Sequence, residues 1–280
     1  MKIFIKVWTL ITHTFRESLA KKTFIVFFVL STLNHLFFLL ALDVDVVDGA
    51  VAMVQIFGQE LQSNQQIDVQ KMIIVIESFI AVFFAFIGGI FFSIFATASL
   101  VPTMLEKGSI EILLSKPLSR TQIFIGRFLG AQSIMVINVI YLIGGSWLIL
   151  SMKTNFWYIP YLYSIPMVIA AFAFMYALMA FVGLTTRSTG VSVMVAYAAL
   201  LFSAVFTPNK EKFYALLSKK IYYILDSVYH ALPKTYDMGV ITFSLVSGKP
   251  FDGWTALWTS SIAGFLMLLA SILVFSKKDY

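Results

Sequence analysis

Apolar runs recur along the whole chain and are separated by short polar segments. Runs of about 20 apolar residues match the roughly 30 Å hydrocarbon thickness of a bilayer. Helices must form these runs, because a lipid-exposed backbone has to satisfy its own hydrogen bonds. The pattern therefore predicts an all-α polytopic membrane protein. The six predicted transmembrane helices cover residues 23–42, 73–103, 121–150, 162–185, 189–207 and 254–275.

An amphipathic pattern precedes the first of these helices. In residues 1–22, apolar side chains recur at helical spacing opposite charged ones, which predicts an interfacial helix lying in the membrane surface. The charged head of a signal peptide is the alternative. Because no small-residue cleavage site follows residues 23–42, we expect an uncleaved first span.

A second amphipathic pattern occupies the long segment 208–253. Apolar residues repeat every three or four positions from Phe213 to Val228, and tyrosines flank them. Tyrosine favours the headgroup zone of a membrane. The following apolar stretch, residues 236–246, is too short to span a bilayer, and we expect it to dip in and return. The segment therefore predicts an outer amphipathic helical hairpin before the last span.

The distribution of lysine and arginine indicates the orientation. With the N-terminus inside, the inner segments hold 12 of the 20 basic residues, the two short outer loops hold 2, and the long outer segment holds 6. Loops rich in lysine and arginine stay on the cytoplasmic side of a membrane, and the charges of long loops influence the orientation less than those of short loops. Both termini are therefore predicted to be cytoplasmic, in a multi-pass protein of the cell (inner) membrane.

Composition supports a single transmembrane domain over residues 1–280. Hydrophobic residues make up 60% of the chain, charged residues 12%, and the mean hydropathy is +0.90. The net charge of +6 does not indicate nucleic acid, because the basic residues lie beside the apolar runs, where membrane lipid headgroups explain them better. With no cysteine in the chain, disulfides, thiolate metal sites and cysteine nucleophiles are excluded.

Polar residues inside the predicted spans are candidates for function, because such groups are expensive in lipid. Glu77 lies about one turn into the second span, and Asn138 lies deep in the third. They form a possible intramembrane polar site, although Glu77 could instead reach the outer headgroups. Asn34 and His35, near the middle of the first span, are further candidates.

Three acidic residues, Asp43, Asp45 and Asp48, crowd the outer end of the first span. Their spacing departs from the D-x-D-x-D-G pattern of a calcium loop. We therefore prefer to interpret them as a solvated acidic edge.

Glycines recur at spacings that let helices approach closely. Such contacts could form at a dimer seam or inside one subunit. The glycines concerned are Gly126 and Gly130, Gly88 and Gly89, and Gly144 and Gly145.

The longest polar stretch on the predicted inner side is segment 104–120, between the second and third spans. Its pattern predicts a short helix over residues 109–115 with Ile110, Leu113 and Leu114 on one face. A short helix with an exposed apolar face needs a partner to cover it. That partner could be the membrane surface, the rest of this chain, or a second protein that accepts the helix in a groove.

The same segment resembles a known family. The order Gly108-Ser109-x-Glu111-x-Leu113-Leu114-Ser115-x-Pro117-x-Ser119-Arg120, with Glu106 upstream, is similar to the first coupling helix of ABC-2-type permeases, in which Gly-Thr stands where this chain has Gly-Ser. The layout of the chain agrees with that family. It also loosely resembles the subgroup that includes the permease of nitrous-oxide-reductase maturation.

The resemblance implies an exporter in which two permeases, copies or paralogues, bind two cytoplasmic ABC ATPase subunits. ATP and Mg would bind to those partners, since this chain has no G-x-x-x-x-G-K-[ST] phosphate loop, and no cofactor is expected in the chain itself. The residues assigned to ATPase coupling are Glu106, Gly108, Ser109, Ile110, Glu111, Leu113, Leu114, Pro117, Arg120 and, in the second inner loop, Arg187.

Two other classes of protein are alternatives. A membrane-embedded enzyme, such as a lipid transferase or an intramembrane hydrolase, could use Glu77, the acidic edge or His230. The sequence shows no close grouping of acid, base and nucleophile that would favour it. A membrane anchor that holds an ATPase without transporting anything is the other alternative.

Overall fold

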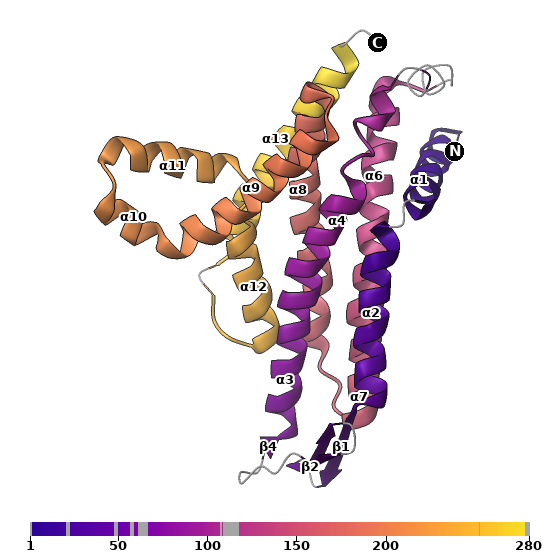
Figure 1. The fold of residues 1–280 in the computed structure, drawn as a ribbon, viewed down its shortest axis with the longest axis vertical. Helices are drawn as coiled ribbons and strands as arrows, with labels where there is room; N and C mark the ends of the chain where they lie inside the picture. Colours follow the sequence, from indigo (N-terminus) through magenta and orange to yellow (C-terminus); the bar gives the residue numbers. More distant parts are fainter. Residues whose placement is uncertain are drawn as a thin grey trace.

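The structure, a computed structural model, is a long helical bundle with a small sheet at one end (Figure 1). Both termini lie toward the end of the bundle where α6 begins, and the strands lie at the opposite end. The described residues are 2–20, 23–47, 50–56, 59–60, 67–106, 108, 118–251 and 253–277.

The bounds of the elements follow the apolar and polar segments of the chain. The first half contains α1 (Lys2–Ala20), α2 (Thr23–Leu40), β1 (Leu42–Val47), β2 (Ala50–Ile56), β3 (Gln59–Glu60), β4 (Ile67–Asp68), α3 (Val69–Phe79), η1 (Ile80–Gly88), α4 (Gly89–Thr97) and η2 (Thr103–Leu105). The second half contains α6 (Arg120–Val139), η3 (Ile140–Gly144), α7 (Gly145–Thr154), η4 (Ile159–Tyr163), α8 (Ser164–Thr186), α9 (Thr189–Phe206), η5 (Thr207–Asn209), α10 (Lys210–Leu216), α11 (Lys219–Ala231), α12 (Thr235–Ser247) and α13 (Thr255–Lys277).

Within the described residues, five continuous helical segments are long and apolar enough to cross a membrane. The shorter α2 is a further apolar helix. The chain is therefore a polytopic, predominantly α-helical membrane protein, as its apolar runs predict. The five segments are Val69–Thr97, Arg120–Thr154, Ile159–Thr186, Thr189–Leu216 and Thr255–Lys277.

Helix α8 lies at the centre of the bundle. It packs against α13, α9, α6, α12 and α4. Its sequence is apolar nearly all the way round, and a helix of that kind is buried on every side. Phe172, Met175 and Tyr176 on α8 are accordingly fully buried.

The second long helix is not a regular α-helix throughout, because η1 is a π-helix between α3 and α4. Its i→i+5 turns contain more residues than the 3.6 of an α-turn. In an α-helix, side chains four positions apart are displaced slightly around the helix axis, always in the same direction. The wider turns of η1 displace them in the opposite direction. A row of exposed apolar side chains therefore continues along one side of all three elements: Phe79, Phe83, Ile87, Phe91 and Phe95.

The segment between α2 and α3 forms a small antiparallel sheet that was not predicted from the sequence. Strand β2 lies between β1 and β3, and β4 also pairs with β2. The alternation of aspartate and valine in β1 has the period of two that is typical of strands. On the predicted acidic edge, Asp43 forms an ion pair with Lys153 over 2.9 Å.

Lys153, near the end of α7, also ties that helix to the end of α2. Its ammonium group donates hydrogen bonds to the backbone carbonyls of Leu39, over 2.9 Å, and of Leu42. A cation at this position satisfies carbonyl groups that the end of a helix leaves unpaired.

The segment after α9 forms helices, as its amphipathic pattern predicts. Figure 1 shows α10 and α11 projecting together from the side of the bundle where α9 ends. The apolar stretch that we expected to dip into the membrane is α12, which packs against α8, η1 and η4. Two buried serines fix its start, since Ser203 accepts a hydrogen bond from the N–H of Tyr236 and Ser260 from the N–H of Lys234.

Candidate functional site

The predicted ATPase-coupling segment lies mostly outside the described residues. Glu106 is exposed, and Gly108 has a φ of +86°, which glycine adopts at little cost. Helix α6 then starts with a capping box, in which Ser119 and Gln122 each bind the other's backbone N–H. The residues outside the description are Ser109, Ile110, Glu111, Leu113, Leu114 and Pro117.

The two predicted coupling arginines lie at helix ends. Arg120, the first residue of α6, donates a hydrogen bond to the carbonyl of Ser276 near the end of α13, over 3.1 Å. Arg187 ends α8 with a φ of 55°, and its N–H donates to the carbonyl of Gly183. Arg120 therefore joins the start of α6 to the last helix, and Arg187 shapes the turn between α8 and α9.

Helix α1 docks closely on α6 through the two glycines spaced four apart. A Cβ atom added to Gly126 would lie 2.8 Å from the Cβ of Leu10, and one added to Gly130 would lie 2.5 Å from the Cβ of Thr14. Only glycine permits this approach, because real Cβ atoms do not come so near. The glycine pair therefore packs helices inside one subunit, the second of the two roles considered for it.

A largely buried ion pair strengthens the same contact. Arg127 of α6 donates to the carboxylate of Glu17 on α1, and their side chains are 4% and 26% exposed. A buried arginine without its partner is strongly unfavourable. The N-terminal helix is thus held on α6 by shape and by charge, about two helical turns after the start of α6 at Arg120.

Removing the carboxylate of Glu17 should show how much the ion pair with Arg127 contributes to the stability of the folded protein. We expect Glu17→Ala to destabilise the folded protein by about 2 kcal/mol, less than for a fully buried pair because water reaches Glu17. The measurement is the thermal unfolding of the purified protein in detergent. Glu211→Ala, which removes an exposed carboxylate on α10, is the control. An unfolding temperature unchanged by Glu17→Ala would mean that the pair contributes nothing.

The two predicted intramembrane polar residues are both buried. Glu77, on α3, is 0% exposed, and its two carboxylate oxygens have no hydrogen-bond partner among the residues that the structure describes. Asn138, on α6, donates to the carbonyl of Ile134 over 3.0 Å. No described contact joins Glu77 to Asn138, so the structure does not bring them together in one site.

Of the two polar candidates on α2, His35 has a packing role, whereas the buried Oδ1 atom of Asn34 has no hydrogen-bond partner among the described residues. The Nε2 atom of His35 lies 3.1 Å from the carbonyl of Leu142. Its ring also fills the space over Gly145, where an added Cβ would lie 2.5 Å from the imidazole. His35 therefore holds α2 against the junction of η3 and α7.

An apolar groove of about 530 Å³ opens between η1, α4, α9 and α12. Its size is typical of sites for small ligands. The hydroxyl of Tyr197 donates to the carbonyl of Phe91 over 2.9 Å, and their rings stack 4.7 Å apart. The groove therefore offers an almost wholly hydrophobic surface, bounded by Phe86, Phe91, Tyr197, Leu200, Gly239 and Phe243.

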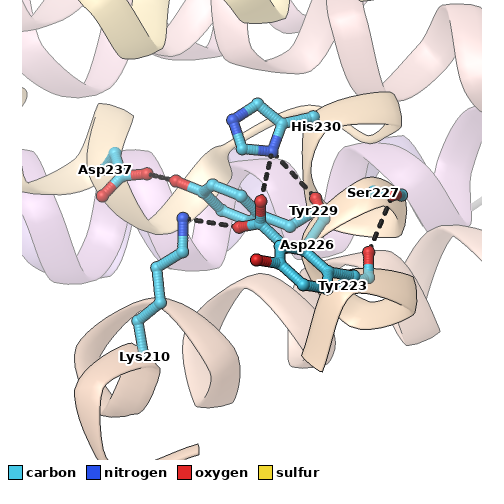
Figure 2. Close-up of polar contacts among 7 residues, drawn as sticks. All are labelled: Lys210, Tyr223, Asp226, Ser227, Tyr229, His230 and Asp237. Atoms are coloured by element: carbon cyan, nitrogen blue, oxygen red, sulfur yellow. Dashed lines mark hydrogen bonds and ion pairs between the residues drawn. The ribbon is translucent and has the colours of Figure 1, made fainter. Parts of the chain in front are cut away.

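A cluster of charged residues lies where α10 and α11 join the bundle, and Figure 2 shows its contacts. The ammonium of Lys210 lies 2.7 Å from the carboxylate of Asp226, and His230 lies 3.6 Å from the same group. The hydroxyl of Tyr229 donates to Asp237 on α12. The first two contacts lie within α10 and α11, and the bond from Tyr229 to Asp237 fixes α11 to the start of α12.

The Glu17–Arg127 pair and this cluster were not predicted from the sequence. Arg127 carried a signal, because it is the only charged residue of the predicted span 121–150. The cluster of α10 and α11 carried none, because its acidic and basic residues come from an ordinary amphipathic pattern.

Comparison with known proteins adds one match. A family model described as "ABC-2 family transporter protein" matches residues 8–280. No curated protein matches the chain.

Proposed function

Because the chain belongs to the ABC-2 family of transporter proteins, we propose that it is the permease subunit of an ABC exporter. It supplies the membrane path, and a separate cytoplasmic ATPase binds ATP and Mg. The single observation that supports this most is a family match that runs through nearly the whole chain. The resemblance of segment 104–120 to a coupling helix agrees with it.

The proposed topology has six spans, with α2 as the first and both termini in the cytoplasm of a cell with this protein in its inner membrane. At 1.5 Å per residue, the 18 residues of α2 extend about 27 Å, close to the thickness of the hydrocarbon core. The termini and the start of α6 lie toward one end of the bundle (Figure 1). That arrangement supports an even number of spans.

The docking of α1 suggests how movement passes from ATPase to membrane. ATP binding would draw the two ATPases together and displace segment 104–120 as a rigid body. Helix α6 begins directly after this segment, and α1 is attached to it through Gly126, Gly130 and Arg127. Arg120 also joins α6 to the end of α13. The inner halves of α1, α6 and α13 would therefore move together.

We place the path of an apolar substrate along the groove between α4, α9 and α12, and we propose a second permease, copy or paralogue, to complete the transporter. The enzyme alternative finds little support in the described residues. Glu77 has no hydrogen-bond partner among the described residues, Asp43 pairs with Lys153, and His230 contacts Asp226. No described contact joins these three candidate catalytic groups.

The direct test is affinity purification of the tagged chain in mild detergent, followed by identification of co-purifying proteins and an ATPase assay. We expect an ATPase with Walker motifs to co-purify and to hydrolyse ATP. Recovery of the chain without any ATPase, from membranes in which an ABC ATPase is present, would overturn the proposal.

A further inference from the structure

Two cavities of opposite character flank α12. The apolar groove lies on one side of this helix, and a polar pocket of about 330 Å³ lies on the other, between α11, α12 and the start of α13. Val240 lines both cavities. A molecule with one polar end and one apolar end could therefore occupy both by lying across this side chain.

The polar pocket contains one charge of each sign. Lys234 directly precedes α12 and Asp237 lies in its first turn, and both side chains line this pocket. Lys234 is 7% exposed, and burial lowers the pKa of its ammonium group, while Asp237 opposes that change. Its ammonium lies 4.8 Å from the ring centre of Tyr229. A buried lysine of this kind is expensive unless a counter-charge satisfies it.

The surrounding charges decide which counter-charge fits. Lys210 lies 4.8 Å from the same tyrosine ring and pairs with Asp226, so Lys210, Lys234, Asp226 and Asp237 together are formally neutral. Asp237, Lys210 and Asp226 all act on Lys234. A neutral cluster attracts a simple anion weakly, because each lysine is offset by a carboxylate. A ligand carrying both charges can match Lys234 and Asp237 separately.

We propose that α12 carries a binding site for an amphiphile with a zwitterionic phosphate–ammonium headgroup. The phosphate contacts Lys234, the ammonium contacts Asp237, and the acyl chain crosses Val240 into the apolar groove. Tyr229, whose hydroxyl donates to Asp237 (Figure 2), holds one carboxylate oxygen and leaves the other to the ligand. As a substrate site this inference rests on the proposed function, whereas the binding itself requires no ATPase.

The test measures lipid binding to the purified chain by native mass spectrometry. The probes are phosphatidylethanolamine, which carries both charges, phosphatidylglycerol, which lacks the ammonium, and phosphoethanolamine, which lacks the chains. We expect phosphatidylethanolamine to bind at least about tenfold more tightly than either of the others, a difference of about 1.4 kcal/mol. Equal affinity for the two lipids would overturn the zwitterionic site, and tight binding of phosphoethanolamine would overturn the role of the groove.

Substitutions locate the site. Asp237→Asn keeps an acceptor for Tyr229 and should abolish the preference for phosphatidylethanolamine over phosphatidylglycerol. Lys234→Gln should weaken binding of both lipids about tenfold, and Lys234→Arg should restore it. Lys220→Gln, which removes an exposed charge on α11, is the control. If Lys234→Gln does not fold, the proposal is tested by Asp237→Asn alone. An unchanged preference of that variant for phosphatidylethanolamine over phosphatidylglycerol overturns the proposal.

Two further outcomes separate this inference from its alternatives. A second copy of the chain could fill the groove, in which case Val240→Cys would form a disulfide-linked dimer and bind no lipid, and the proposal would fail. The ATPase assay on the same preparations tests the proposed function independently. If the chain binds lipid but has no ATPase partner, only the proposed function is overturned. If it has an ATPase partner but binds no lipid, only the proposed lipid site is overturned.

Discussion

Leu113→Asp is expected to release the ATPase while leaving the permease in the membrane. The predicted inner helix of residues 109–115 has one apolar face, and Leu113 lies on that face. Burying an unpaired carboxylate in an apolar groove of the partner should cost about 3 kcal/mol, which is roughly a hundredfold loss of affinity. Co-purification of the ATPase with the tagged chain measures it. Glu111→Ala should weaken or uncouple the ATPase in the same assay.

The neighbouring residue provides a matched control. Ile112 lies on the opposite side of the same predicted helix, so Ile112→Asp introduces the same charge without entering the proposed contact. We expect that variant to keep the ATPase. Full ATPase binding and normal transport in Leu113→Asp would contradict the coupling assignment, and equal loss in both variants would indicate a general effect of charge.

Gly130→Leu is expected to separate α1 from α6 and to uncouple ATP hydrolysis from transport. Even a Cβ atom at this position would lie 2.5 Å from the Cβ of Thr14, so a leucine side chain has no space between the helices. Overpacking of this kind costs about 3 kcal/mol. The result should be a lower unfolding temperature in detergent and, because α1 no longer follows α6, ATP hydrolysis with little transport.

A glycine elsewhere in the same long helix controls for the residue type. An added Cβ at Gly144 meets no atom within 4 Å. Gly144→Leu should therefore be tolerated, with a small gain from the better helix propensity of leucine. If Gly130→Leu and Gly144→Leu unfold at the same temperature and transport equally well, the close contact between α1 and α6 has no mechanical role.

The membrane helices could be predicted because length and hydrophobicity are sufficient physical signals. A run of apolar residues has few alternatives to a helix in lipid, and α2 and α13 lie on such runs. The π-helix η1 could not be predicted, since its sequence is as apolar as that of its neighbours. The strand β1 could have been, because its alternating aspartates have the period of a strand.

The contact between α1 and α6 shows where sequence reasoning ends. The amphipathic pattern of α1 predicts a helix with one apolar face, but lipid and a second helix satisfy that face equally well. Gly126 and Gly130 indicated a close helix contact without naming the partner. Only the fold shows that Leu10 and Thr14 fill those positions and that Glu17 meets Arg127. The location of α1 in the membrane surface stays a prediction.

Only part of the candidate site could be predicted, because the sequence does not show which helices pack together. The coupling segment was predicted through a motif, which needs no knowledge of the fold, and its role stays a prediction. The pocket at Lys234 and Asp237 could not be found, because Tyr229 from α11 and Thr255 from α13 complete it, and the sequence does not show how these helices pack against α12.

The proposed coupling to an ATPase requires that segment 104–120 faces the side of the membrane where ATP is found. The chain has no cysteine, so single-cysteine variants can be labelled without background by a maleimide that cannot cross the membrane. We predict that Ser218→Cys, between α10 and α11, is labelled in intact cells, and that Ser115→Cys is labelled only after the membrane is opened. Labelling of Ser115→Cys in intact cells would contradict the account.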